Sequence, residues 1–430
     1  MTEIFEPGAA FAEALDRADP LRRFRDQFAM PVPHRAAESI YLDGDSLGLQ
    51  PRAARDMVIA ELDRWADNGA RGHFETDRPW VPYHQLLAEP MGRLTGALPT
   101  EVVTMNGLTV NLHLLMVSFY RPTTSRYKIL IEDHAFPSDH YAVDSQIRAH
   151  GLDPARALVT VEPRPGEETL RTEDLIDAID RHGSELALVL LPGIQYYTGQ
   201  VLPMAELAAA ARAVGAPIGL DLAHAVGNIE LSLHDLDIDF AVWCTYKYLN
   251  AGPGATGGAF VHERHHGDSD LPRYHGWWGH DRATRFEMDT LFRPIPTAEA
   301  WLVSNSPILA MAPLLGSLAV FEEAGGIGPL RTKSEVMIQY MDYLLDTRLE
   351  GRVESITPRA LDQRGCQHSL RINDPSVSGQ QVYEELAAAD VQCGWRYPNV
   401  VRVAPVPLYN SFADIHRFVS ILEQILDQRA

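Results

Sequence analysis

The chain has 430 residues, of which 46% are hydrophobic and 22% charged, a composition typical of a globular enzyme of two or three domains. Its formal net charge of −21 argues against nucleic acid and membrane surfaces as partners, because both attract basic patches. The three cysteines are far apart and form no CxxC pair, which argues against disulfides or a zinc site. No signal peptide and no run of 18 apolar residues is found, so we expect a cytoplasmic protein.

Elements taken in chain order indicate an α/β fold. The segment to about Phe28 is expected to be helical, and a helix near Arg52–Asn68 is expected after the turn YLDGDSLGLQP. Further along, short apolar runs alternate with helical patterns, which predicts a mostly parallel sheet flanked by helices. The expected strands are Tyr127–Ile131, Leu186–Leu191, Pro217–Asp221, Phe240–Cys244 and Gly258–His262, and the expected helices are Ser138–His150 and Met204–Val214.

The last hundred residues show a different pattern of expected strands and helices. Strands are expected at Cys366–Asn373 and Val400–Ala404, and a closing helix at Phe412–Asp427, which together predict a smaller C-terminal α+β domain. We therefore expect three parts: an N-terminal helical segment, 1–70, that belongs to the small domain, a large cofactor-binding α/β domain, 71–330, and the small domain, 331–430.

The chemistry is expected at the carboxyl ends of the strands, where Asp221 and Lys247 lie. An isolated lysine in a polar turn after an apolar strand suits Schiff-base formation with pyridoxal phosphate (PLP). A carboxylate on a neighbouring strand end suits the pyridine nitrogen of that cofactor, which it keeps protonated. Asp221, His224 and Lys247 thus form the main candidate constellation, against the alternative that the Asp/Lys pair is an ordinary surface ion pair.

A phosphate group needs its own site, and the chain has no GxxxxGK[ST] loop. Gly107-Leu108-Thr109 opens a helical run, and a helix N-terminus offers free N–H groups to a phosphate. A plain helix cap explains the same residues equally well. The glycine-rich run 252–258 is interpreted as a tight connection into the next strand.

The histidine cluster, the cysteines and a tryptophan motif can each be explained by structure alone. His262, His265 and His266 lack the HExxH spacing, so we expect a solvated turn and no metal site. Cys244 and Cys366 flank apolar strands and are expected to be small core residues. The motif GWWGH (276–280) indicates either a binding wall or interface, or a core pair under a loop.

Taken together, these segments resemble the kynureninase family, fold-type I PLP enzymes related to class V aminotransferases. The resemblance covers most of the chain, and few proteins share all of its motifs in this order. The motifs are YLDGDSLGLQP, RGHFETDRPW, MNGLTVNLHLLM, FPSDHYAVDSQ, PGIQYYTGQ, DLAHAVGNIELSLHD, CTYKYLNAGPG, GWWGHDRATRFEMD, VSNSPI and VVRVAPVPLYNSF.

The resemblance assigns roles to particular residues. It implies that Lys247 is the Schiff-base lysine, that Asp221 pairs with the pyridinium nitrogen, and that Tyr246 binds phosphate and relays a proton. It further implies that Arg402 clamps the substrate carboxylate through its planar fork of donors. The other cofactor residues implied are Leu108, Thr109, Phe136, Asp139, His224, Trp277 and Asn305, and the other substrate residues are Ser46, His73, Ser304 and Asn305.

The resemblance also implies an assembly and a reaction. Trp277 and Asn305 would come from the neighbouring subunit, so a homodimer with shared active sites is expected. The reaction implied is hydrolysis of the Cβ–Cγ bond of L-kynurenine, 3-hydroxy-L-kynurenine or both, giving an anthranilate and L-alanine in the tryptophan catabolism that leads to NAD. Polar groups at His73 and Asn305 favour the 3-hydroxy substrate, because they are left unpaired without its hydroxyl.

One departure from the family motif keeps the substrate open. The family usually has GNSLG where this chain has an aspartate, Asp45, whose carboxylate either disturbs a nearby anionic substrate or points away. The alternative function is therefore a kynureninase-like enzyme of secondary metabolism that acts on a substituted kynurenine. A cysteine desulfurase would need a nucleophilic cysteine on a mobile loop, which is not found, and a silent PLP-fold protein would not need Lys247, Asp221 and Arg402 together.

Overall fold

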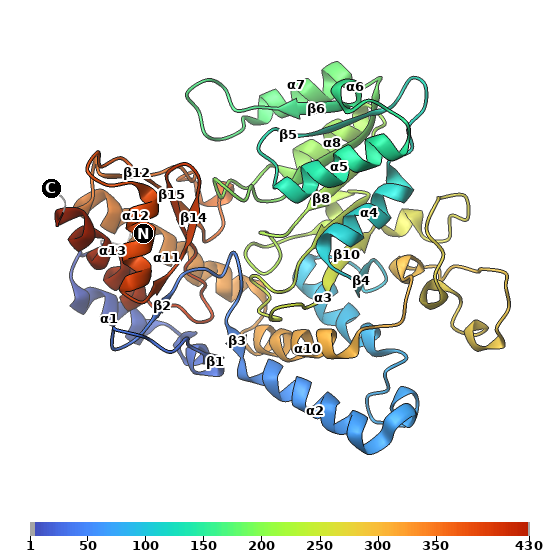
Figure 1. Ribbon diagram of the computed structural model, residues 1–430, viewed down its shortest axis with the longest axis horizontal. Helices are drawn as coiled ribbons and strands as arrows, with labels where there is room; N and C mark the ends of the chain where they lie inside the picture. The colour runs from blue at the N-terminus through green and yellow to red at the C-terminus, as the bar shows by residue number, and fades with distance from the viewer. Residues whose placement is uncertain (1–4, 429–430) are drawn as a thin grey trace.

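The computed structural model describes residues 5–428, and its largest element is a seven-stranded sheet (Figure 1). The strands are β4 (Val102–Met105), β5 (Lys128–Glu132), β6 (Leu158–Val161), β7 (Leu186–Pro192), β8 (Ile218–Asp221), β9 (Phe240–Trp243) and β10 (Gly257–Val261). Their order in space is β4-β10-β9-β8-β7-β5-β6. All neighbours from β9 to β6 pair in parallel, whereas β10 is antiparallel to both β9 and β4.

Helices cover both faces of this sheet. The neighbouring residues Leu188 and Val189 of β7 belong to different apolar clusters, because side chains alternate between the two faces of a strand. One cluster includes residues of α4 (Leu108–Phe119) and α5 (Pro137–Ala149), and the other includes residues of α7 (Thr172–His182) and α8 (Met204–Ala213). Burial on both faces explains why strands such as LALVLL are continuously apolar.

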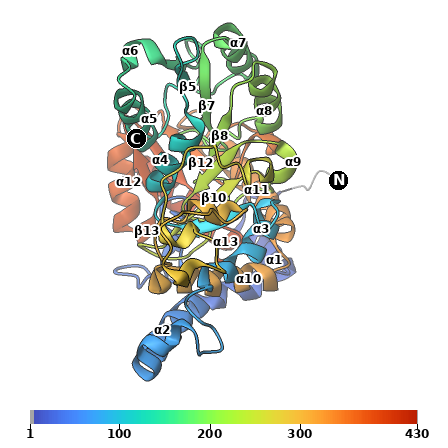
Figure 2. The same ribbon diagram turned by 90° about the vertical axis from the view of Figure 1, so that its right-hand side faces the viewer.

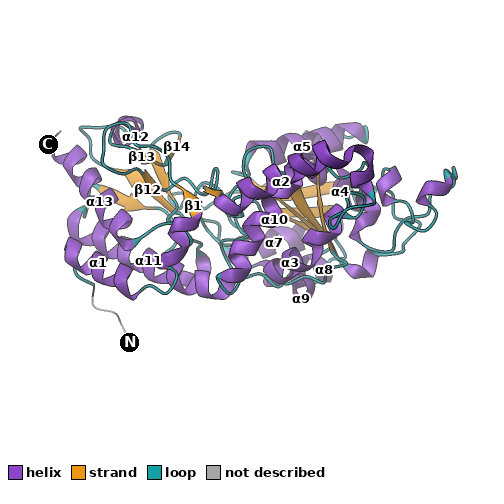
Figure 3. Ribbon diagram, turned by 90° about the horizontal axis from the view of Figure 1, so that it is seen from below, coloured by secondary structure: helices purple, strands orange, loops and turns teal. Residues whose placement is uncertain are grey.

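A second, antiparallel sheet lies in a separate lobe (Figure 3). Its order is β11 (Val353–Ser355), β12 (His368–Ile372), β15 (Val400–Val403) and β14 (Gly394–Arg396). A third apolar cluster joins this sheet to α11 (Ile327–Arg348), α12 (Gly379–Ala388), α13 (Phe412–Asp427) and the N-terminal α1 (Ala9–Ala18). The two ends of the chain therefore pack together, as the blue and red ribbons on the left of Figure 1 show.

The remaining elements connect the two lobes. Helix α2 (Arg52–Asn68) packs along α10 (Ile308–Glu323) and projects from the body of the molecule (Figure 2). In residues 5–428 no single helix is long and apolar enough to cross a membrane, and only the bent pair α10 and α11 meets that length and composition together. The other strands and helices are β1 (Phe28–Ala29), β2 (Ile40–Tyr41), β3 (Gln50–Pro51), β13 (Val391–Gln392), α3 (Ala88–Thr95), α6 (Pro154–Ala157) and α9 (Leu233–Leu236). The 3₁₀ helices are η1 (Arg22–Gln27), η2 (Gly69–His73), η3 (Tyr83–Leu87), η4 (Glu263–His265), η5 (Trp277–Gly279), η6 (Arg285–Glu287), η7 (Ala298–Trp301) and η8 (Leu361–Gln363).

The expected fold class is confirmed, and each expected strand and helix is found to within about two residues. The N-terminal segment is less regular than expected. Its helix stops at Ala18, and a 3₁₀ helix follows, because the side chain of Asp19 accepts the N–H of Leu21 and turns the chain. The reversed direction of β10 was not predicted, because an apolar strand has the same sequence pattern in either direction.

A tight contact beside Asp221 gives a test of the packing. A Cβ on Gly219 of β8 would lie 2.1 Å from the ring of Phe240 on β9. We expect Gly219→Ala to lower the free energy of unfolding by about 2–3 kcal/mol, because a core ring must move. Gly328→Ala in α11 is the control, since its Cβ would meet only the flexible end of Glu230, at 3.3 Å. Equal melting temperatures for the two variants would contradict the packing described.

Candidate active site

A cavity of about 360 Å³ lies at the carboxyl ends of the parallel strands. Asp221 ends β8, and Lys247 follows β9, so both project from the same edge of the sheet. The opposite wall comes from the other lobe, through Arg396 and Arg402, and from the N-terminal loop, through Asp45. The site is therefore assembled from three segments that are distant in the sequence.

Lys247 is the lysine that faces this cavity. The chain has only three lysines, and the other two are held by carboxylates, Lys128 by Glu185 and Lys333 by Asp19. Lys247 Nζ lies instead 2.9 Å from His224 Nε2 and 5.9 Å from the centre of the Phe136 ring. Its amine is thus placed in a partly apolar pocket without a tight counter-ion, which is the setting that a nucleophilic lysine needs.

His224 accepts this hydrogen bond as a neutral imidazole. Its side chain is buried, and burial together with the charge of Lys247 holds its pKa well below the ordinary value. Because the Nε2 atom faces the lysine, the proton of the neutral ring belongs on Nδ1, which is buried and has no protein partner. A donor is thus left available inside the site.

Asp139 and Asp221 form a coupled pair of carboxyl groups. Burial and the neighbouring charge of Asp221 raise the pKa of Asp139 well above its ordinary value, so Asp139 keeps its proton. Burial raises the pKa of Asp221 as well, but the N–H of Ala223, 2.7 Å from Asp221 Oδ1, and the hydrogen bond from Asp139 act in the opposite direction and favour its charged form. The pair therefore presents one fixed negative charge at the end of β8.

Glu132 is a third acid in the cavity, and the sequence reasoning missed it. Burial raises the pKa of Glu132 to about 8, with a further contribution from Asp221. One oxygen accepts a hydrogen bond from Gln195 at 3.3 Å, and the other has no partner. Glu132 ends β5 as Asp221 ends β8, so the strand-end rule would have found it had the strand YKILI been extended by one residue.

The N-terminus of α4 opens into the cavity. Leu108 and Thr109 line the cavity, and the N-cap is Gly107, which has no side chain to cap the first turn. A Cβ at Gly107 would meet no atom within 4 Å, so there is open space beside the first turn, whose N–H groups have no partner within the helix. Tyr246 lies on the same cavity wall, and burial raises the pKa of its hydroxyl, which stays protonated. These groups can hold a phosphate.

Arg402 lies in the opposite wall, and it is 1% exposed. Its Nη1 atom donates to the carbonyl of Tyr196 at 2.7 Å, and its Nη2 atom lies 2.6 Å from Asp45 Oδ2. Arg396 lines the same wall, and burial, together with the charge of Arg402, lowers its pKa. The sequence reasoning did not find Arg396 or the contact made by Asp45.

Of the residues assigned by resemblance, most line this cavity. They are Ser46, Leu108, Thr109, Phe136, Asp139, Asp221, His224, Tyr246, Lys247 and Arg402.

Four of the assigned residues do not. His73 packs edge-on against Trp80, and Trp277 donates through Nε1 to the carbonyl of Arg285. Ser304 and Asn305 are exposed in the loop before α10. Within one chain these side chains form no part of the cavity.

The cysteines do not offer a nucleophile. All three are buried and free. Burial raises the pKa of Cys244, at the cavity wall, and raises that of Cys366 to about 12. Both thiols therefore stay protonated at neutral pH, unlike a persulfide-forming cysteine.

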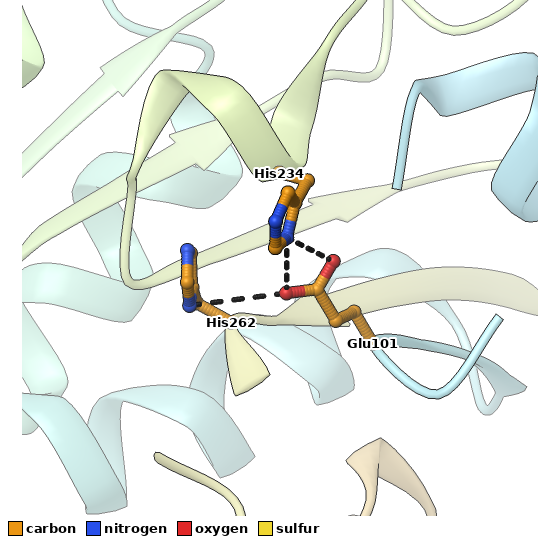
Figure 4. Close-up of side chains that lie close together, drawn as sticks. All are labelled: Glu101, His234 and His262. Carbon is orange, nitrogen blue, oxygen red and sulfur yellow. Dashed lines mark hydrogen bonds and ion pairs between the residues drawn. The ribbon is translucent and has the colours of Figure 1, made fainter. Parts of the chain in front are cut away.

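A second group of ionisable side chains lies at the other edge of the sheet (Figure 4). His234 Nδ1 is 3.0 Å from Glu101, the two imidazole rings of His234 and His262 stack, and His262 Nδ1 is 3.8 Å from the same carboxylate. The carboxylate also accepts two backbone N–H groups, and His262 Nδ1 accepts one from its own turn. These hydrogen bonds join neighbouring loops. They also occupy lone pairs of Glu101 and His262 that a metal ion would need.

His262 also corrects an expectation. The histidines after β10 were expected in a solvated turn, but His262 is buried between Phe260 and His234.

A larger cavity, of about 610 Å³, adjoins the first and shares Glu132 and Tyr196 with it. It contains neither Lys247 nor Asp221, so the reactive groups belong to the smaller cavity. Exposed Tyr397 of the small lobe closes its outer side.

Comparisons with known proteins agree with this geometry. The class-V aminotransferase family matches residues 40–271, and the kynureninase C-terminal domain matches residues 330–422. A cysteine desulfurase from Thermococcus onnurineus NA1 superposes with a TM-score of 0.75 at 18% identity, covering 100% of both chains. A mutant of C-DES with glycine linked to its PLP cofactor gives 0.73 at 17% identity, covering 91% of this chain and 99% of that one. At these identities the two structures show the fold alone.

The fold and the site thus define a PLP-dependent protein of the class-V aminotransferase type. Sequence relatives narrow this class. The kynureninase of Xanthomonas oryzae pv. oryzae (strain PXO99A) is 55% identical over 98% of this chain and 99% of its own. The kynureninase of Myxococcus xanthus (strain DK1622) is 52% identical over 98% of each chain. The chain belongs to the kynureninase family.

The residues present fit PLP. The uncapped turn of α4 suits its phosphate, and the single charge of the Asp139–Asp221 pair suits a protonated pyridine nitrogen. His224 Nδ1 and one oxygen of Asp139 are buried without protein partners, as expected where a polar ligand completes a site.

The acids of the cavity predict how stability depends on pH. Below pH 4.5 Glu132 is protonated in both the folded and the unfolded state. Between this pH and about 8 only the unfolded state loses the proton, so stability falls by up to about 1.4 kcal/mol per pH unit and then levels off. We expect Glu132→Gln to make this fall shallower. The measurement is the melting temperature from pH 5 to 8, with exposed Glu350→Gln as control, and parallel curves for Glu132→Gln and wild type would contradict the raised pKa.

Proposed function

We propose that this protein hydrolyses the Cβ–Cγ bond of L-kynurenine or 3-hydroxy-L-kynurenine, giving an anthranilate and L-alanine. The observation that carries the proposal is Lys247, the lysine that faces the cavity, held beside neutral His224 and charged Asp221. Support comes from relatives named kynureninase that align over nearly the whole chain.

The chain's own residues have separable tasks. Bound PLP supplies an electron sink for the charge left at Cα. Asp221, which is kept charged by the proton on Asp139, holds a proton on the pyridine nitrogen. The Lys247 amine takes the α-proton, and its neighbour His224 stays neutral. A water molecule that is admitted to the site attacks the γ-carbonyl. Tyr246 stays protonated and is our candidate for the proton donor.

We further propose a homodimer whose subunits share their active sites. The ring of Phe286 contacts the rings of Phe74 and Trp277, with ring centres 5.6 Å apart in both pairs, yet all three side chains are about half exposed. The segment that includes η5 and η6, drawn in yellow and gold on the right of Figure 1, projects from the body of the molecule. An apolar patch of this kind favours an interface, and a partner would bring Trp277 and Asn305 toward the cavity that lacks them.

We make further proposals about the preferred substrate, the location of the reaction and the domain boundaries. Polar His73 and Asn305, brought by a partner, would favour the 3-hydroxy substrate. We place the reaction in the cytoplasm and in tryptophan catabolism, where it supplies precursors of NAD. We also propose the division into 1–70, 71–330 and 331–430, although α2 packs along α10 of the central part.

Turnover tests the reaction directly. The PLP-loaded protein is mixed separately with L-kynurenine and 3-hydroxy-L-kynurenine, and each anthranilate is followed by fluorescence and chromatography. Lys247→Ala should lower kcat by at least about 10³-fold, because the amine that takes the proton is gone. A protein that binds PLP but converts neither substrate would refute the proposal and favour a substituted kynurenine.

Co-expression of two inactive variants tests the shared site. In a mixed dimer of Lys247→Ala and Trp277→Ala, a site built from both subunits leaves one site with both changes and one site intact. Random pairing should then restore about a quarter of wild-type activity. If Trp277 acts within its own chain, every site carries one change and no activity returns.

A further inference from the structure

Asp45 and Arg402 form a buried ion pair in the wall of the cavity. Asp45 is fully buried, and its Oδ2 atom lies 2.6 Å from Arg402 Nη2. We propose that Asp45 is an internal competitor that occupies Arg402 until the substrate carboxylate displaces it, so that Asp45 weakens substrate binding. The inference rests on the proposed function, in which Arg402 binds that carboxylate.

Asp45 lies against Nη2 of Arg402, the nitrogen that takes part in both ways of binding a carboxylate. An arginine offers a carboxylate two parallel hydrogen bonds either from Nη1 and Nη2 or from Nε and Nη2, so Nη2 is common to both arrangements. In Arg402, Nη1 already donates to Tyr196, and Nε is buried without a partner. Because Asp45 Oδ2 lies 2.6 Å from Nη2, a substrate carboxylate that binds in either arrangement must share Nη2 with Asp45 or displace it. Displacing Asp45 would release the fork that includes Nε.

The loop that carries Asp45 is held from several sides. The N–H groups of Ser46 and Leu47 donate to the carbonyl of Asp43, and the N–H of Gly48 donates to the carbonyl of Tyr246. A Cβ at Gly44 would lie 2.4 Å from the hydroxyl of Tyr409, so the backbone is pressed against the core there. Asp45 therefore stays on Arg402 in the free site, and moving it away costs part of the free energy that a substrate carboxylate gains by binding.

Acidic and basic side chains face one another in this wall, Asp43 and Asp45 on one side and Arg396 and Arg402 on the other. Burial and the charge of Asp45 raise the pKa of Asp43 to about 7, so Asp45 is the carboxylate that is paired with Arg402. A substrate carboxylate adds a further negative charge beside Asp45. Replacing Asp45 by asparagine leaves one cation unmatched, which the substrate carboxylate then balances.

The effect should appear in binding and not in the chemical step. The carboxylate contacts Arg402 before and during the reaction alike, so its cost is common to both states and raises KM without changing kcat. Asp45 is thus an affinity-determining residue that takes no part in proton transfer.

The experiment compares holoenzymes that differ at Asp45. Asp45→Asn is nearly isosteric, and Asp43→Asn is the matched control, since Asp43 lies close to the same guanidinium groups but makes no ion pair with Arg402. The binding probe is desaminokynurenine, which keeps the carboxylate but lacks the α-amino group that reacts with the cofactor, and its uncharged carboxamide is the second probe. Calorimetry gives Kd for both probes, and steady-state kinetics with L-kynurenine give KM and kcat.

We expect Asp45→Asn to bind the acid about tenfold more tightly and to lower KM by a similar factor, with kcat within about twofold and the carboxamide unaffected. Asp43→Asn should change the Kd of the acid less. An unchanged Kd for the acid, equal gains for acid and carboxamide, or an equal gain in Asp43→Asn would each overturn the inference. Should Asp45→Asn not fold, Asp45→Ser is measured with the same criteria.

The outcomes also separate the two proposals. A wild-type holoenzyme that neither converts L-kynurenine nor binds the acid overturns the proposed function and, with it, the inference. A wild type that converts L-kynurenine, with an Asp45→Asn variant of the same KM and Kd, overturns the inference alone.

Discussion

Keeping unlike charges buried in one cavity is the constraint on which this architecture depends. Asp221 and Arg402 are buried and Lys247 is partly buried, and a charge that is taken out of water without a partner costs several kcal/mol. Each is therefore given a specific neighbour: neutral His224 for the lysine, a protonated Asp139 for Asp221, and Asp45 for Arg402. The parallel strands supply the edge on which the first two meet, and the small lobe supplies the third.

Sequence reasoning could predict what local pattern determines. Strand ends placed Asp221 and Lys247 on one edge because neighbouring parallel strands finish together, and the same rule extends to Glu132. Family resemblance added residues of the cavity wall such as Phe136 and Arg402. The direction of β10 could not be predicted, because alternation and hydrophobicity do not depend on strand direction.

The remainder of the site depends on tertiary packing. Arg396 comes from an edge strand and Asp43 from an N-terminal loop, and nothing in their local sequence places them near Lys247. For Asp45 the sequence left two orientations open, and the structure selects the one toward Arg402. Trp277 and Asn305 lie outside the cavity of a single chain, so their assignment depends on an assembly and not on a fold.

The central claim is that Lys247 is the residue that carries the cofactor, and borohydride reduction followed by peptide mass spectrometry tests it most directly. With only three lysines in the chain, the assignment is unambiguous. The account predicts a pyridoxyl-phosphate mass on the peptide that contains Lys247, and none on those with Lys128 or Lys333, which are paired with Glu185 and Asp19. Label on either of these two lysines, or on none of the three, would contradict it.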